Sequence, residues 1–294
     1  MTLTIAEWFG YSPSDASSAA SRFRAESLCP FLQKRCNKVF NDRTVSGVCS
    51  VLPGRASASP IPICPNRMYA GHFAVLNKVS EIAFGAGHQV TLLSEYQPDA
   101  GVGAVVAIAE LRLPSRDRHG SYFVDWILAR VSPSGGLAEF TAVEVQTIDT
   151  TGSYRPEVEE LRQGHWPGGK SKAGLNWENV SKRILPQLIY KGHVLQREPL
   201  CTKGLFFICP SEVHERIRVR IGGRLEAYGL QHGAITFLWY GLDPSAVGNL
   251  RPLSYRGQFS TTVEQVAFSF VAPADLPPAG SYESVIRSQL QIYD

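Results

Sequence analysis

The chain has 294 residues, of which 44% are hydrophobic and 19% charged, and its net charge is +3. This composition supplies enough apolar surface for a substantial core and excludes a chain that is disordered throughout. No apolar stretch approaches the ~20 residues of a membrane-spanning helix, and the N-terminus does not read as a secretory signal. We therefore expect a cytoplasmic protein, in which thiols stay reduced and clustered cysteines favour a metal over disulfides.

The first part of the chain divides into three segments. Residues 1–27 are expected to form a helical lead-in, and residues 28–67 form a small unit rich in loops that holds four of the six cysteines. Apolar positions spaced three or four residues apart predict an amphipathic helix over residues 68–84.

Strands dominate the next part of the chain. β-branched and aromatic runs predict three strands, at residues 102–109, 122–131 and 140–148. A polar, Gly-rich loop over residues 150–174 precedes a helix at 177–191 and a buried strand at 205–209. Residues 210–294 mix strands and turns. We expect a four-cysteine unit and helices over residues 1–84 and an α/β (α+β) core over residues 85–294, packed as one compact domain.

The four N-terminal cysteines have the pattern C-x6-C-x12-C-x14-C. They are Cys29, Cys36, Cys49 and Cys64. Four thiolates suit tetrahedral binding of zinc or iron, and a site with four protein ligands has a structural role. The alternative is four buried cysteines without a metal, because the thiol packs as a small apolar group. Cys201 and Cys209 lie in apolar surroundings and are expected to be core thiols.

The strands at 122–131 and 140–148 flank Pro133-Ser134-Gly135-Gly136, which predicts a hairpin turn. A turn centred between Ser134 and Gly135 pairs Asp125 with Glu144 across the strands, with Cβ atoms about 5 Å apart. The alternation of side chains puts Gln146 on the face of Glu144. Val143 and Val145 then face the opposite side of the sheet.

Two facing carboxylates in an apolar sheet repel each other unless a cation lies between them. Magnesium prefers carboxylate oxygens, keeps several waters and supports attack of water on a phosphodiester. Asp125 and Glu144 are thus candidate magnesium ligands. The alternative is that both acids lie at strand ends and are solvated.

The segment at residues 176–192 predicts a helix with two different faces. Val180, Ile184 and Leu188 form an apolar stripe. Polar side chains that suit DNA lie beside it: Asn179, Lys182, Arg183 and Gln187. Asn176 is a candidate N-cap, Gly192 a candidate stop, and Pro186 is expected to kink the helix. The alternative is a solvated polar face. The basic loop at 162–172 precedes this helix and suits closure over DNA.

Several segments together resemble the NotI-like restriction endonucleases. They are CPFL at 29–32, GVCSV at 47–51, CPNR at 64–67, VDWILARV at 124–131, VEVQTIDTTGSYR at 143–155 and GLNWENVSKRILPQLIYKG at 174–192. The matches recur in order from about residue 25 to 210, and the C-terminal third resembles the family only loosely.

The resemblance implies a PD-(D/E)xK fold, a mixed sheet flanked by helices, in a bacterial homodimer that cuts palindromic DNA. It implies catalytic positions at Asp125, Glu144 and Gln146, and iron on the four cysteines, although the spacing alone does not separate iron from zinc. It also implies a GC-rich target such as CGGCCG, 5′-phosphate ends and a cognate DNA methyltransferase in the host. The chain departs from the general nuclease pattern at Val124, in place of proline, and at Gln146, in place of lysine.

Two interpretations follow from these features. The first is a magnesium-dependent type II restriction endonuclease, for which Glu110 is a candidate further acidic group; the alternative for Glu110 is a solvated charge at a strand end. The second is a non-catalytic, sequence-specific DNA-binding protein with a four-cysteine metal module, which needs the basic helix but not the carboxylate pair.

Overall fold

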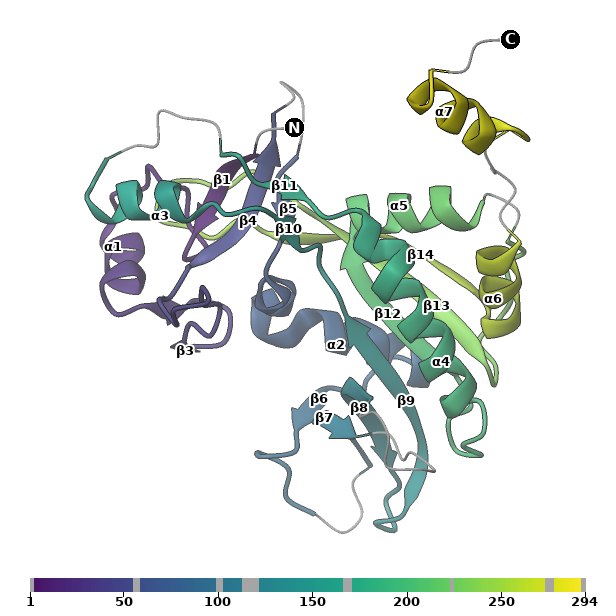
Figure 1. The fold of residues 1–294 in the computed structure, drawn as a ribbon. Helices are drawn as coiled ribbons and strands as arrows, with labels where there is room; N and C mark the ends of the chain where they lie inside the picture. Colours follow the sequence, from purple (N-terminus) through teal and green to yellow (C-terminus); the bar gives the residue numbers. More distant parts are fainter. Residues whose placement is uncertain are drawn as a thin grey trace.

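A seven-stranded mixed sheet forms the centre of the molecule (Figure 1). The computed structural model describes residues 3–54, 59–98, 103–112, 122–165, 171–222, 225–272 and 278–291. The strands, in spatial order, are β14 (Leu253–Thr262), β13 (Ala234–Leu242), β12 (Leu205–Pro210), β9 (Leu137–Val145), β8 (Phe123–Val131), β7 (Ala104–Arg112) and β6 (Val90–Leu92). β13, β12 and β9 are parallel, and β8 is antiparallel to both of its neighbours. The expected mixed sheet with helices is confirmed.

Helices cover both faces of this sheet. One face packs against α4 (Leu185–Leu195), α5 (Ser211–Ile221) and α6 (Val263–Val271), and the other against α2 (Ala70–Phe84). β12 is buried on both sides, as expected for a central strand that is parallel to both neighbours. Its side chains alternate: Leu205 and Phe207 belong to the core under α4, whereas Phe206 and Ile208 belong to the core under α2.

The hairpin of β8 and β9 has the register that the sequence predicts. Trp126 pairs with Val143 and Arg130 with Glu139, and a bulge follows beside the turn. The turn is closed by Ser132 N–H, which donates to the Gly136 carbonyl at 2.8 Å. Because the shift lies between Arg130 and Val131, it leaves the register near Asp125 unchanged.

The segment expected to form one helix at 177–191 instead forms a π-helical turn followed by an α-helix. A π-helical turn spans Val180–Ile184, and α4 follows directly with Pro186 in its first turn. This position tolerates proline, since the first turn of a helix has no acceptor for its N–H. The expected Asn176 cap is wrong, because no side chain caps this turn. The expected stop at Gly192 is also wrong: α4 continues to Leu195, and the missing side chain of Gly192 leaves room for Val263 of α6.

The N-terminal segment is not the helical lead-in that we expected. Residues 3–8 form β1 (Leu3–Trp8), which joins β4 (Val48–Pro53) and β5 (Ile61–Pro62) in a separate three-stranded sheet. Among the described residues of this segment, the helix is α1 (Ser18–Ala25), which is capped by the Ser17 hydroxyl. The two short strands β2 (Leu28–Cys29) and β3 (Lys34–Arg35) lie within the cysteine unit. A 3₁₀ turn at Pro65–Tyr69 leads into α2.

The loop expected over residues 150–174 contains further elements. They are β10 (Thr150–Thr151), α3 (Arg155–Arg162) and β11 (Gly174–Leu175). Residues 166–170, the middle of the basic loop expected to close over DNA, lie outside the described residues. The last helix, α7 (Ser281–Gln289), stands apart from the sheet and has no buried residue (Figure 1).

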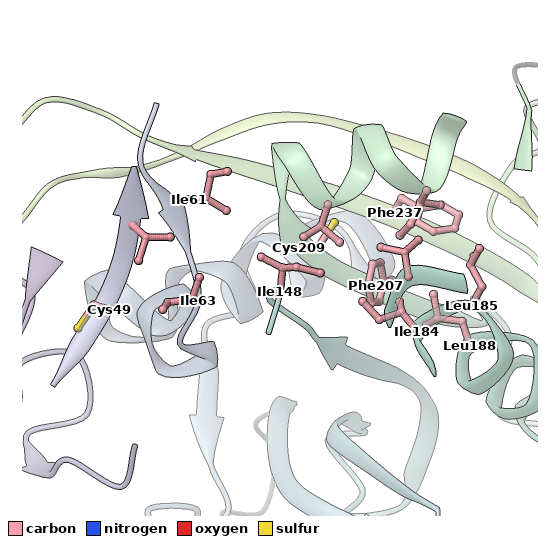
Figure 2. Close-up of a cluster of buried hydrophobic side chains, with 14 of the residues drawn as sticks. Cys49, Ile61, Ile63, Ile148, Ile184, Leu185, Leu188, Phe207, Cys209 and Phe237 are labelled. Carbon is pink, nitrogen blue, oxygen red and sulfur yellow. The ribbon is translucent and has the colours of Figure 1, made fainter. Parts of the chain in front are cut away.

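One hydrophobic cluster joins the small sheet to the large one (Figure 2). It runs from Cys49 and Ile61 past Ile148 to Phe207 and Leu185. The division at residues 84 and 85 stays a prediction, and this shared core favours the expectation that both parts form one compact body. Among the described residues, none of the helices is long and apolar enough to cross a membrane.

Candidate active site

Asp125 and Glu144 come together at the end of the β8–β9 hairpin. The backbone N–H of Val145 donates to Asp125 Oδ2 at 2.8 Å, so the aspartate is tied to the strand that carries Glu144. Ala142 belongs to the core under α4, whereas Val143 and Val145 belong to the core under α2. By alternation Glu144 therefore faces α4. The expectation for the two valines is confirmed.

Both carboxyl groups are held in surroundings that disfavour their charge. Glu144 is only 2% exposed. Burial, followed by the charge of Asp125, raises the pKa of Glu144 to about 7. Burial also raises the pKa of Asp125, and the Val145 N–H opposes this shift by favouring the charged form. The alternative in which these acids are solvated at strand ends does not describe this site.

Lys191 of α4 is a residue of this site that sequence reasoning missed. Its Nζ lies 2.7 Å from Glu144 Oε1, and both side chains are almost fully buried. The angles of this contact are not those of a hydrogen bond, since Glu144 Oε1 has no aligned donor. The signal in the sequence is a lysine three residues after Leu188 on the apolar stripe of the helix.

A pocket of about 490 Å³ opens beside the carboxylates. Its wall includes Asp125, Gln146 and Glu110, whereas Glu144 lies behind the wall. Gln146 continues the β9 chain and donates its N–H to the Ile208 carbonyl. Glu110 has a left-handed backbone, with φ of 51°, which is uncommon for a residue other than glycine. Its charge raises the pKa of Asp125, so it lies within electrostatic reach of that carboxylate.

Two of the polar helix residues reach the same pocket. Asn179 and Arg183 line it, and both contact Asp149 Oδ2, Asn179 through a 2.8 Å hydrogen bond. Lys182 is an exposed residue that pairs with Glu178, and it is absent from the pocket wall, as is Gln187. The apolar stripe of Val180, Ile184 and Leu188 is buried as expected.

The cysteine unit supplies the opposite rim of the pocket. Lys34, Asn37 and Asn66 line it there, and Asn66 Nδ2 donates to Asn37 Oδ1 at 2.8 Å. Sequence reasoning missed this arrangement, because nothing local indicates that residues 34–37 face the β8–β9 hairpin. The pocket thus offers amide and cationic groups around an acidic floor, a combination suited to a phosphate backbone.

All four N-terminal cysteines are buried, as are Cys201 and Cys209. Burial raises the pKa of the thiols of Cys29, Cys36 and Cys49, and the nearby charge of Cys64 adds to each shift. Backbone N–H groups of Phe31 and Leu32 favour the thiolate of Cys29. Cys64 therefore lies within electrostatic reach of the other three cysteines.

In the part of the chain that the structure describes, no three Cys, His, Asp or Glu side chains are gathered closely enough to hold a metal ion. A pair of carboxylates such as Asp125 and Glu144 is nevertheless enough for magnesium. This ion binds proteins through one or two carboxylates and takes its remaining ligands from water and substrate phosphates. The Asp125 carboxylate, which lines the pocket beside Glu144, offers the oxygens that such a cation prefers.

The comparisons with known proteins point to one family. The family model described as restriction endonuclease NotI matches residues 16–200, which include the cysteine unit, the β8–β9 hairpin and α4. No curated protein matches the chain significantly.

Proposed function

Because the chain belongs to the NotI family of restriction endonucleases and is therefore a type II site-specific deoxyribonuclease, we propose that Asp125 and Glu144 are the magnesium ligands of its active centre. The observation that carries this proposal is the Asp125 carboxylate at the pocket wall, with the buried carboxylate of Glu144 close beside it. Their mutual repulsion is unfavourable without a cation and is relieved by one. The family assignment favours this interpretation over a non-catalytic DNA-binding protein.

The residues at the pocket have different roles in hydrolysis. Asp125 and Glu144 would hold a magnesium ion, which would supply positive charge against the scissile phosphate and favour ionisation of the attacking water. Asp125, tied by the Val145 N–H, keeps its oxygens at the pocket wall. Gln146 is neutral, so it orients a water or the phosphate by hydrogen bonds. Asn179 and Arg183, together with Lys182 and Gln187 of the same helical segment, contact the DNA.

Digestion of a GC-rich plasmid tests this function. With magnesium, the wild-type protein should make double-strand cuts, and Asp125→Ala should not. Sequencing the ends should give one repeated palindrome with 5′-phosphates. An intact plasmid with wild type, or equal cutting by the variant, would contradict the catalytic assignment.

We further propose a GC-rich palindromic target such as CGGCCG. The chain length and the segment 174–192 resemble EagI, a shorter member of the family, and this likeness supports the target. Such an enzyme acts in the bacterial cytoplasm beside a cognate methyltransferase that protects host DNA. The end sequences from the plasmid digest test the target directly.

We propose that the active form is a homodimer. One copy supplies one Asp125–Glu144 pair, whereas cutting both strands of a palindrome calls for two such centres related by a twofold axis. Sedimentation of the protein on a palindromic duplex should give two chains per duplex. One chain per cleaved duplex would contradict this proposal.

For the four-cysteine unit we propose a structural iron or zinc ion. The support is the burial of Cys29, Cys36, Cys49 and Cys64, and the electrostatic reach of Cys64 to the other three. Thiolates so buried are unfavourable without a cation. Elemental analysis should give one iron or zinc per chain, and a folded protein without metal would contradict the proposal.

A further inference from the structure

Lys191 lies where a lysine is costly. It belongs to the inward face of α4, together with Leu188 and Leu195, and is 5% exposed. Taking an ammonium out of water costs several kcal/mol unless a charged partner compensates. The partner is Glu144, whose Oε1 lies 2.7 Å from Lys191 Nζ.

The ammonium of Lys191 also acts on the second carboxylate of the site. Its charge lowers the pKa of Asp125 as well as that of Glu144. The ammonium of Lys191 thus stabilises the charged form of both carboxylates. When Lys191, Asp125 and Glu144 are all ionised, their net charge is still negative. A divalent cation remains favourable there, because Lys191 offsets only one of the two negative charges.

The position two residues after Glu144 holds no charge. General nuclease motifs carry a lysine there, but this chain has Gln146. Lys191 comes instead from a helix, through a fold that brings α4 onto the face to which Glu144 points. Lys191 and Glu144 both lie outside the pocket wall, so Lys191 acts on the site through its charge on Glu144 and Asp125 and not by contact with the substrate.

We propose that Lys191 is a positioning residue of the active centre, which fixes the Glu144 carboxylate in one orientation for the divalent cation. The inference rests on the proposed role of Glu144 as a metal ligand. A group that holds a metal ligand in place typically contributes ~10- to 100-fold to metal affinity.

Binding of Mn²⁺ alone to the DNA-free protein at pH 7, followed by electron paramagnetic resonance, tests the inference. Lys191→Met should weaken Mn²⁺ binding at least ~10-fold, and Lys191→Arg, which keeps the charge, should restore part of it. Lys78→Met is the control: it removes an ammonium that pairs with Glu81 on α2, away from the pocket, and should leave binding unchanged. If Lys191→Met does not fold, Lys191→Gln takes its place.

Thermal unfolding separates this role from a purely structural one. A structural ion pair would lower the melting temperature of Lys191→Met and leave its Mn²⁺ affinity within about twofold of wild type. Unchanged or tighter Mn²⁺ binding in the variants would overturn the inference. Asp125→Asn and Glu144→Gln test the proposed function separately: if both bind Mn²⁺ as wild type does, the metal assignment itself fails, whatever Lys191 does.

Discussion

At the scale of single residues, burial of Asp125 and Glu144 disfavours the negative charge of both carboxylates. Protonation, the ammonium of Lys191 and a divalent cation each relieve this conflict in part. The sequence predicted the two acids from the spacing of a hairpin. It did not predict Lys191, because a lysine on a helix is usually solvated, and the packing of α4 against the sheet buries this one.

The raised pKa of Glu144 predicts how stability depends on pH. Since its folded-state value of about 7 lies above the ordinary 4.5, the folded state favours the protonated carboxyl. This contribution is present below pH 4.5 and is lost as the pH rises to about 7, a change on the order of 3 kcal/mol. Urea denaturation of the metal-free protein at pH 5 and pH 8 should show this loss.

Glu144→Gln is the matched control for this prediction, because the amide does not titrate. Between pH 5 and pH 8 the free energy of unfolding of Glu144→Gln should therefore increase, relative to that of wild type, by about that amount. Parallel pH profiles for the two proteins would contradict the buried, titrating Glu144.

At the scale of elements, short sequence patterns predicted the features that depend on neighbouring residues, namely the hairpin register and the buried face of a helix. The Pro-Ser-Gly-Gly turn and the alternation in β8 and β9 predicted the register in which Trp126 pairs with Val143, and Asp125 and Glu144 are the next residues on the two strands. The stripe of Val180, Ile184 and Leu188 gave the buried face of the helix. The predicted end of the helix at Gly192 was wrong. The glycine is needed for close packing against Val263, which lies 71 residues away in the sequence and therefore leaves no local pattern.

Gly192→Ala tests this explanation for the course of α4. An added Cβ would lie 2.8 Å from Val263 Cγ2, and such overpacking costs ~1–3 kcal/mol, more than the ~1 kcal/mol that alanine gains over glycine in a helix. We expect a net loss of about 1 kcal/mol in urea denaturation. Gly229→Ala, where no atom lies within 4 Å of the added Cβ, should stay within about 0.5 kcal/mol of wild type. A stabilised Gly192→Ala would contradict the close approach.

At the scale of the whole molecule, the cysteine unit and the large sheet share a core and a pocket. Cys49 and Ile61 belong to the same cluster as Phe207 (Figure 2), and Lys34 and Asn66 line the pocket that holds Asp125. These relations were beyond prediction because they depend on pairings distant in sequence, such as β1 with β4.

Because the two parts share this core, we predict that loss of the proposed metal would also disturb the active centre. Cys64→Ser should lose the bound iron or zinc, melt at a lower temperature and cleave DNA more slowly, because the proposed ion would stabilise the unit whose Lys34 and Asn66 line the pocket. Cys201→Ser, a buried thiol outside the unit, should keep the metal. Full metal content in Cys64→Ser, measured by elemental analysis, would count against the four-cysteine site.

The rate of DNA cleavage in a single turnover, measured against magnesium concentration, tests the carboxylate centre most directly. Wild type should cleave only with magnesium, and Asp125→Asn and Glu144→Gln should each lose at least ~100-fold in rate at every magnesium concentration. Glu215→Gln removes an exposed carboxylate that pairs with Arg218 on α5 and should cleave as wild type does. Cleavage by Asp125→Asn and Glu144→Gln at the wild-type rate would contradict the account.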